Sequence, residues 1–500
     1  MATRPINTAS LSDAPTYQLQ CTRSSLFPRL PFTPLVNPLK SEDVRMGNNC
    51  SSSSTPMTDT GGSVARRSSS ESLSTLAESI MSKDDKRKDA RLSISSTTST
   101  LVPSSPTLAN EKEKEGTPPT SSTTVPSNRA AYPWSVHDIS LLPLELFVEP
   151  KVFSPSSPSP NPFPRYGLSA PSTLTSDGQL LLFGGLKHGT PVPTNELYSL
   201  SLDCAQSSSR DAPVDLKKIE TAADVPSPRV GHGCARLNDV MAVWGGDTSS
   251  SLDAPDLELD SKLYLYNMVS REWTRIKMEP DSATPKGRYG HTLSAVGPML
   301  YVFGGQREGT FFNDMWSFDL RSLRDYKTNP LRWELVHEDG AIKVPARRTG
   351  HVSVSDGDKI YIFGGTDGQY HYNDTWMFCT STRTWTELSC IGYIPSAREG
   401  HAAAAANGRM YIFGGRGVNG EDLADLAAFC FQKRRWYMFQ NMGPAPCARS
   451  GHAMATFGSR VVVVGGESSI AQCEDDKGRK AKESCSKIHI LDTRHIKYPS

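Results

Sequence analysis

Six arginines, each followed two residues later by glycine, are the residues of this sequence whose type and spacing could do chemistry. Five of the six phrases continue with histidine, as Arg-x-Gly-His. A planar guanidinium binds a carboxylate or a phosphate with two parallel hydrogen bonds, so arginines gathered on one face would suit an acidic or phosphorylated peptide. The alternative is that each arginine binds backbone carbonyls of a neighbouring element. The six are Arg165, Arg229, Arg288, Arg348, Arg398 and Arg449.

Two segments rich in aromatic residues lie between these arginines. They are QREGTFFND (306–314) and TDGQYHYND (366–374), and both have the Gly and Asn/Asp content of loops. Exposed aromatic side chains are costly for solubility and often mark a binding surface. We therefore predict that they line the same partner-binding face as the arginines. The residues concerned are Phe311, Phe312, Tyr370, His371 and Tyr372.

Each arginine stands at the start of a repeated unit, and the strands of that unit must hold the arginine in position. An apolar segment ending in two glycines follows, such as IYIFGG (360–365), and then a segment with Tyr or Trp, such as NDTWMF (373–378). A tryptophan closes most units. The segments are short, β-branched and aromatic, which predicts strands, and the arginines recur every 50 to 64 residues. Four short strands cannot cover both faces of their own sheet, so we predict six sheets packed around one axis.

These units resemble kelch repeats, and the resemblance covers residues 133–498. It implies an all-β, six-bladed kelch β-propeller, with repeats starting near residues 165, 229, 288, 348, 398 and 449. Phrases such as GGTDGQYHYNDTW (364–376) are similar to the fungal kelch proteins that mark cell ends and organise polarity, the Tea and Kel class.

That resemblance implies a non-enzymatic scaffold for protein–protein interaction in cell polarity, cell-end marking or control of mitotic exit. It also implies a cytoplasmic protein enriched at the cell cortex or growing tips. Members of that class usually carry C-terminal coiled coils, and the sequence has no heptad stretch, so self-association and the completeness of the C-terminus stay open. Two alternatives are a substrate-recognition adaptor of a ubiquitin ligase and, less favoured, a copper enzyme resembling galactose oxidase.

The sixth unit has no closing tryptophan, and an unpaired sheet edge would be left exposed there. The segment YPWSVHDI (132–139) carries Trp134 just before the first unit. We predict that this segment supplies the closing strand of blade six. The competing candidate is RHIKYP (494–499) at the other end of the chain.

Residues 1–132 have a different composition, and we predict a disordered regulatory tail. Residues 51–130 contain 39 Ser, Thr or Pro and no Trp, Phe or Tyr, so they have little apolar surface to offset the entropy of ordering. Basic residues or a following proline make phosphorylation candidates of Ser68, Ser69, Ser70, Ser105 and Thr117. If translation starts at Met46, Gly47 would become a myristoylation candidate.

Composition excludes several other classes. The chain has 54 Lys and Arg and 53 Asp and Glu, so its net charge does not favour binding to nucleic acid. No apolar run is long enough to span a membrane, and the N-terminus lacks a secretory layout. The ten cysteines form no metal-binding motif and the histidines recur one per unit, so we expect no metal and no cofactor. Cys473 and Cys485 could pair only under oxidising conditions.

Overall fold

The structure is a computed structural model. It describes residues 132–142, 161–190, 192–202, 212–248, 259–440, 442–469 and 485–498, together with Leu73, Leu76, Ala77, Ser79 and Ile80. The phosphorylation candidates Ser68, Ser69, Ser70, Ser105 and Thr117, and the segment around Gly47, lie outside these residues.

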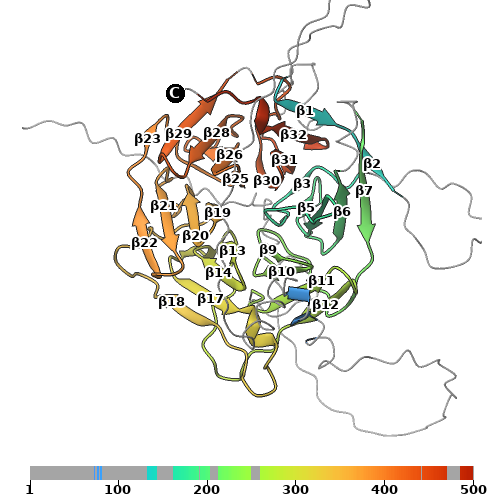
Figure 1. Cartoon of the computed structure of the whole chain (residues 1–500), viewed down its shortest axis with the longest axis vertical. Coiled ribbons are helices and arrows are strands. Elements are labelled where there is room, and N and C mark those ends of the chain that lie inside the picture. The colour runs from blue at the N-terminus through green and yellow to red at the C-terminus, as the bar shows by residue number, and fades with distance from the viewer. Residues whose placement is uncertain are drawn as a thin grey trace, which may run out of the picture.

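Six mainly antiparallel sheets surround one axis, as Figure 1 shows, so the chain is an all-β, six-bladed propeller. In blades two to six the first strand of each sheet lies nearest the axis and the fourth lies toward the rim, where β8 and β23 add a fifth strand to blades two and five. The strands of the first three blades are as follows. Blade one contains β4 (Gln179–Phe183), β6 (Leu197–Ser201), β7 (Val214–Ile219) and β2 (Ile139–Leu141). Blade two contains β9 (Gly233–Leu237), β10 (Val240–Trp244), β11 (Leu263–Asn267), β12 (Glu272–Arg275) and β8 (Ala222–Ala223). Blade three contains β13 (Thr292–Val296), β14 (Met299–Phe303), β17 (Met315–Asp319) and β18 (Glu334–His337).

The remaining blades repeat this order. Blade four contains β19 (Val352–Asp356), β20 (Lys359–Phe363), β21 (Thr375–Cys379) and β22 (Thr384–Glu387); blade five contains β25 (Ala402–Ala406), β26 (Arg409–Phe413), β28 (Leu426–Cys430), β29 (Arg435–Phe439) and β23 (Ile391–Gly392); blade six contains β30 (Ser450–Phe457), β31 (Arg460–Glu467), β32 (Ile488–Asp492) and β1 (Trp134–His137). Short two-stranded pairs join β3 (Arg165–Tyr166) to β5 (Leu186–Lys187), β15 (Gln306–Arg307) to β16 (Thr310–Phe311), and β24 (Arg398–Glu399) to β27 (Arg416–Gly417). The 3₁₀ helices are η2 (Leu320–Leu323) and η3 (Thr493–His495).

Alternating strand direction gives the ring two distinct faces. We call the side that carries the Arg-x-Gly-His segments and the double glycines the loop face. The opposite side, which carries the tight turns after β9 and β11, we call the turn face. The glycines of the six Arg-x-Gly phrases form a ring of their own around the axis, because each donates its N–H to the carbonyl of the preceding one at 2.8–3.0 Å. They are Gly167, Gly231, Gly290, Gly350, Gly400 and Gly451.

The fourth strand of blade six comes from the N-terminal side of the propeller. β1 pairs antiparallel with β32, with Trp134 opposite Leu491 and His137 opposite Ile488. β2 then runs parallel to β7 of blade one, so one short segment bridges the last blade and the first. RHIKYP does not take this position, because it begins inside η3.

Aromatic residues fill the spaces between blades in a regular way. Trp385 of blade four lies 4.8 Å, centroid to centroid, from Phe303 of blade three, and Trp436 of blade five lies at the same distance from Phe363 of blade four. The histidine of the next phrase packs edge-on against the same ring, as His351 does on Phe303. The first glycine of each pair must be small, because a Cβ on Gly304 would lie 2.8 Å from the His351 ring.

The structure describes one ordered place within residues 1–132, where the sequence predicts disorder. Leu73, Leu76, Ala77, Ser79 and Ile80 are helical, and Leu76, Ala77 and Ile80 are buried in the same apolar cluster as residues of blades two and three. Apolar residues with helical spacing in a Ser-rich tail thus pack on an apolar surface of the propeller. Figure 1 shows this segment in blue beside blade two.

Candidate interaction surface

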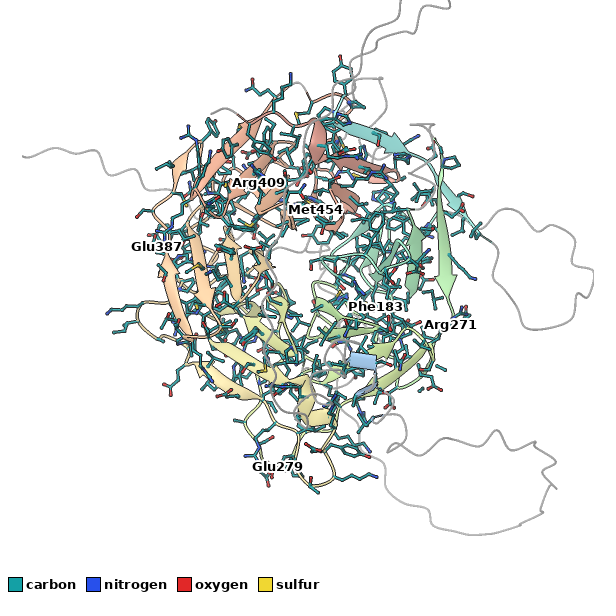
Figure 2. The ribbon with its side chains drawn as sticks, in the orientation of Figure 1. Phe183, Arg271, Glu279, Glu387, Arg409 and Met454 are labelled. Carbon is teal, nitrogen blue, oxygen red and sulfur yellow. The ribbon has the colours of Figure 1, made fainter. Side chains whose placement is uncertain are left out.

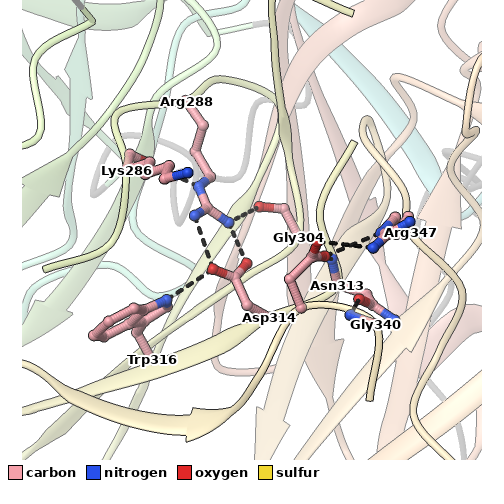
Figure 3. A network of polar contacts seen from close by, with 9 residues as sticks. Lys286, Arg288, Gly304, Asn313, Asp314, Trp316, Gly340 and Arg347 are labelled. Carbon is pink, nitrogen blue, oxygen red and sulfur yellow. Dashed lines mark hydrogen bonds and ion pairs between the residues drawn. The ribbon is translucent and has the colours of Figure 1, made fainter. Parts of the chain in front are cut away.

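The arginine of each phrase is held inside the propeller, as Arg288 illustrates in Figure 3. Its Nε donates to the Lys286 carbonyl at 2.9 Å, and one terminal nitrogen donates to the Gly304 carbonyl at 3.1 Å. Both terminal nitrogens also bind the carboxylate of Asp314. That carboxylate in turn accepts the indole N–H of Trp316 at 2.8 Å. The guanidinium is therefore committed to internal partners.

The same arrangement recurs in five blades. Arg348 binds both oxygens of Asp374 at 2.7 and 2.8 Å, and it donates to the Gly364 carbonyl at 3.0 Å. The acid always precedes the third strand of the blade. The other pairs are Arg165 with Glu196, Arg229 with Asp260, and Arg398 with Asp425.

Arg449 of blade six makes the same backbone contacts as Arg288. It donates to the carbonyls of Cys447 and Gly465, at 3.2 and 3.0 Å. The Cys447 and Cys485 sulfurs lie 3.9 Å apart beside it, and both thiols are buried. Cys485 thus neighbours Cys447, whereas Cys473 lies outside the described residues.

These contacts correct the docking role expected for the six arginines. All six residues are only 0–2 % exposed, and they bind internal carbonyls. Carboxylates of the described residues also bind Arg165, Arg229, Arg288, Arg348 and Arg398. A desolvated guanidinium requires such partners, which explains why the internal alternative prevails. Sequence reasoning missed the carboxylates, although Asp or Glu near the start of most third segments, as in NDMWSFD and NDTWMF, was their signal.

The five aromatic-loop candidates divide into two groups. Phe312 is buried and Tyr372 is partly buried, and their rings lie 4.0 Å under Arg288 and 4.3 Å under Arg348. The Tyr372 hydroxyl also donates to Asp367 at 2.6 Å, and burial raises the pKa of this tyrosine. Tyr370, in contrast, is 66 % exposed, while Phe311 and His371 are partly exposed.

The exposed members of this set lie on neighbouring loops of the loop face. The side chain of Phe311 in blade three reaches across to Gly368 of blade four, where a Cβ would lie 2.9 Å from its ring. His371 of blade four lies 3.9 Å from a carboxylate oxygen of Glu399 in blade five. Val418, 62 % exposed, follows the strand that pairs with Glu399. The loops of blades three, four and five are therefore contiguous.

Buried charges beneath these loops were not foreseen from the sequence. Glu399 is the variable residue of its phrase and is 1 % exposed, and neither carboxylate oxygen has a hydrogen-bond partner in the described part of the chain. It lies opposite Arg416 on the β24–β27 pair. Arg416 Nε lies 3.9 Å from Asp422, which accepts the Ser469 N–H at 2.5 Å. This row of charges links blades four, five and six.

No group of three or more His, Cys, Asp or Glu side chains in the described ranges is arranged to hold a metal ion. The five phrase histidines are buried and dispersed around the ring. Burial, together with the neighbouring arginine, lowers their pKa, to about 3 for His291 and His452. Within the same ranges, no helix is long and apolar enough to cross a bilayer.

The comparison with protein-family models agrees with the six-bladed propeller fold. The model of the KLHDC2/KLHL20/DRC7 Kelch-repeats domain matches residues 172–329 and 252–466, which together are more than half of the chain. The chain belongs to this kelch-repeat family, and its fold is that of a kelch propeller.

The similar proteins include fungal kelch proteins. The chain is 37 % identical over 344 residues to Tip elongation aberrant protein 1 of Schizosaccharomyces pombe, covering 68 % of this chain and 27 % of that protein. It is 34 % identical over 223 residues to Kelch repeat-containing protein 2 of Saccharomyces cerevisiae, covering 44 % and 24 %. A shorter match, 31 % identical over 151 residues, is to the N-(sulfonatooxy)prop-2-enimidothioate sulfolyase of Thlaspi arvense, covering 30 % and 39 %. The chain thus spans about a quarter of the length of the two fungal relatives.

Proposed function

We propose that this chain is a non-enzymatic scaffold that binds partner proteins through the loop face and acts in fungal cell polarity at the cortex or growing tip. The similarity to a tip elongation protein over 344 residues supports the cellular role. The observation that carries the binding surface is the contiguity of exposed Tyr370 and Val418 with Phe311 on three neighbouring loops.

The chemistry of that surface differs from the one expected at the outset. Because the six arginines are buried, they offer no basis for selecting acidic or phosphorylated peptides. The surface presents tyrosine, valine and phenylalanine side chains instead, and aromatic residues are the usual anchors of protein interfaces. We infer that the partner contributes apolar side chains to this contact.

Affinity purification of the tagged full-length chain from growing fungal cells tests this function. The variant Tyr370→Ser/Val418→Ser removes two exposed loop-face side chains without touching the buried pairs. Val269→Ser is the matched control, because Val269 is 75 % exposed on the turn face. We expect partners that co-purify with the wild type and the control to fall at least tenfold with the double variant, and its fluorescent fusion to leave the tip. Unchanged partners and localisation would contradict the proposal.

A further inference from the structure

The N-terminal helical segment docks on the propeller through one face. Its apolar residues Leu73, Leu76, Ala77 and Ile80 follow the i, i+3, i+4, i+7 spacing of an amphipathic helix. Leu76 is 1 %, Ala77 6 % and Ile80 4 % exposed, and Leu73 packs partly buried against the same cluster. Such burial needs a receiving apolar surface, since a helix this short is not stable alone in water.

The receiving surface lies where blades two and three meet. The cluster that contains the helix also contains Val240 and Leu265 from blade two. Blade three contributes Phe318 of β17 and the buried leucines Leu320 and Leu323 of η2. Partly buried Leu237, Met278 and Tyr326 pack against it.

Two asparagine amides add polar contacts to the helix. Asn238, in the turn after β9, donates to the Ile80 carbonyl, and Asn267, at the end of β11, donates to the Ser79 hydroxyl at 3.3 Å. A backbone carbonyl withdrawn from water needs a hydrogen-bond partner, and the Asn238 amide provides one for Ile80. Both asparagines lie on the turn face, away from the loops proposed to bind partners.

We propose that the junction of blades two and three on the turn face is a binding site for an amphipathic helix, and that the chain's own N-terminal segment is its resident ligand. The tether gives this ligand a high effective concentration, so a free helix competes poorly while the segment is in place. The contact is also reversible, because ordering a stretch of tail opposes the burial of only a few apolar side chains. This site is independent of the function proposed for the loop face.

The experiment uses the full-length chain and a fluorescent synthetic peptide of residues 70–83, SESLSTLAESIMSK. In the chain variant Leu76→Asp/Ile80→Asp the tail no longer fits the apolar surface, so the site becomes vacant. We expect this variant to bind the labelled peptide at least tenfold more tightly than the wild type does. A peptide with the same two aspartates is expected to bind neither chain.

A change on the propeller side locates the site. Asn238 has a φ of +50°, so Asn238→Gly removes the amide and keeps a backbone that glycine accepts. Added to the vacated variant, it is expected to weaken peptide binding several-fold, whereas Val269→Asp and Tyr370→Ser/Val418→Ser leave binding unchanged. Equal peptide affinity in the wild type and the vacated variant, with both chains folded by circular dichroism, would overturn the proposal. If the aspartate variant does not fold, Leu76→Ser/Ile80→Ser replaces it with the same expected and overturning results.

Discussion

Trp134 lies against Phe413, with ring centroids 5.9 Å apart and planes at 70°. The first residue belongs to the strand that precedes the propeller repeats, and the second ends the apolar strand of blade five. Trp134 is almost fully buried, and its strand pairs with β32 along its whole length. The pairing therefore joins the two ends of the propeller, and the ring contact packs the joined strands against blade five.

Trp134→Ala should destabilise the propeller by about 3–5 kcal/mol, the usual cost of removing a buried tryptophan. The measurement is urea unfolding followed by circular dichroism. Ile342→Ala is the control, because Ile342 is highly exposed and its truncation should change the free energy of unfolding by less than about 0.5 kcal/mol. Equal losses in the two variants would mean that β1 does not close the ring.

Asp374→Asn should cost about 3–5 kcal/mol of stability, because it leaves the fully buried Arg348 guanidinium without its counter-charge. Glu334→Gln is a matched control. Glu334 pairs with Arg383 at the same 2.7 Å, but both side chains are about half exposed, so less than about 1 kcal/mol should be lost. Similar losses would show that burial of the pair is not what matters.

Arg348→Glu/Arg398→Glu should unfold the propeller. Each glutamate would be buried facing Asp374 or Asp425, and like charges in a desolvated site repel. Size-exclusion chromatography and circular dichroism should show an aggregated or unfolded chain. A folded double variant would contradict the internal role assigned to these arginines.

Acid should destabilise the protein between pH 6.5 and 5 through its buried histidines. The pKa of His291 falls to about 3 through burial and the neighbouring Arg288, whereas an unfolded histidine titrates near 6.5. The unfolded chain therefore binds more protons in this window, and stability is lost as the pH falls, by roughly 2 kcal/mol per histidine at pH 5.

Urea unfolding at pH 7.5, 6 and 5 checks this expectation. His291→Gln should flatten the dependence by about one proton, because it removes one group that titrates only in the unfolded state. An unaltered slope in His291→Gln would show that this histidine is protonated in the folded protein.

Among the six described cysteines, Cys379 should react first with iodoacetamide and Cys485 among the last. Hydrogen bonding to Ser381 lowers the pKa of Cys379, which is partly exposed. The adjacent Cys447 thiol and burial raise the pKa of Cys485, so little thiolate forms there. Peptide mapping by mass spectrometry over a time course gives the order, and early labelling of Cys485 in folded protein would contradict it.

The repeated pattern was sufficient to predict the six blades and most of their strands, but not the fifth strands β8 and β23 of blades two and five. IYIFGG and NDTWMF are short, apolar and regularly spaced, and the structure confirms the six-bladed propeller. Position along the chain does not say which side chains meet across 26 residues, so the pairing of Arg348 with Asp374 was not foreseen. Both residues were visible in the repeat, but only the folded blade brings them together.

The helical tail segment was missed for a different reason. Leu73, Leu76, Ala77 and Ile80 show helical spacing, but the Ser- and Thr-rich surroundings predict disorder when the segment is considered alone. The energy that orders it comes from apolar residues of blades two and three, more than 150 residues away, as the contact between Asn238 and Ile80 shows. The residues around the segment do not indicate that this surface exists. Figure 2 shows how densely side chains occupy the described blades, which supply such surfaces.

The six glycine amides that bond head to tail around the axis form a circuit with neither a first nor a last member. Opening one of these hydrogen bonds leaves the other five in place, and releasing a single blade requires two of them to open together. Hydrogen–deuterium exchange at these six amides should therefore proceed at one common slow rate. The propeller is in this respect one cooperative unit, although its sequence consists of six repeats.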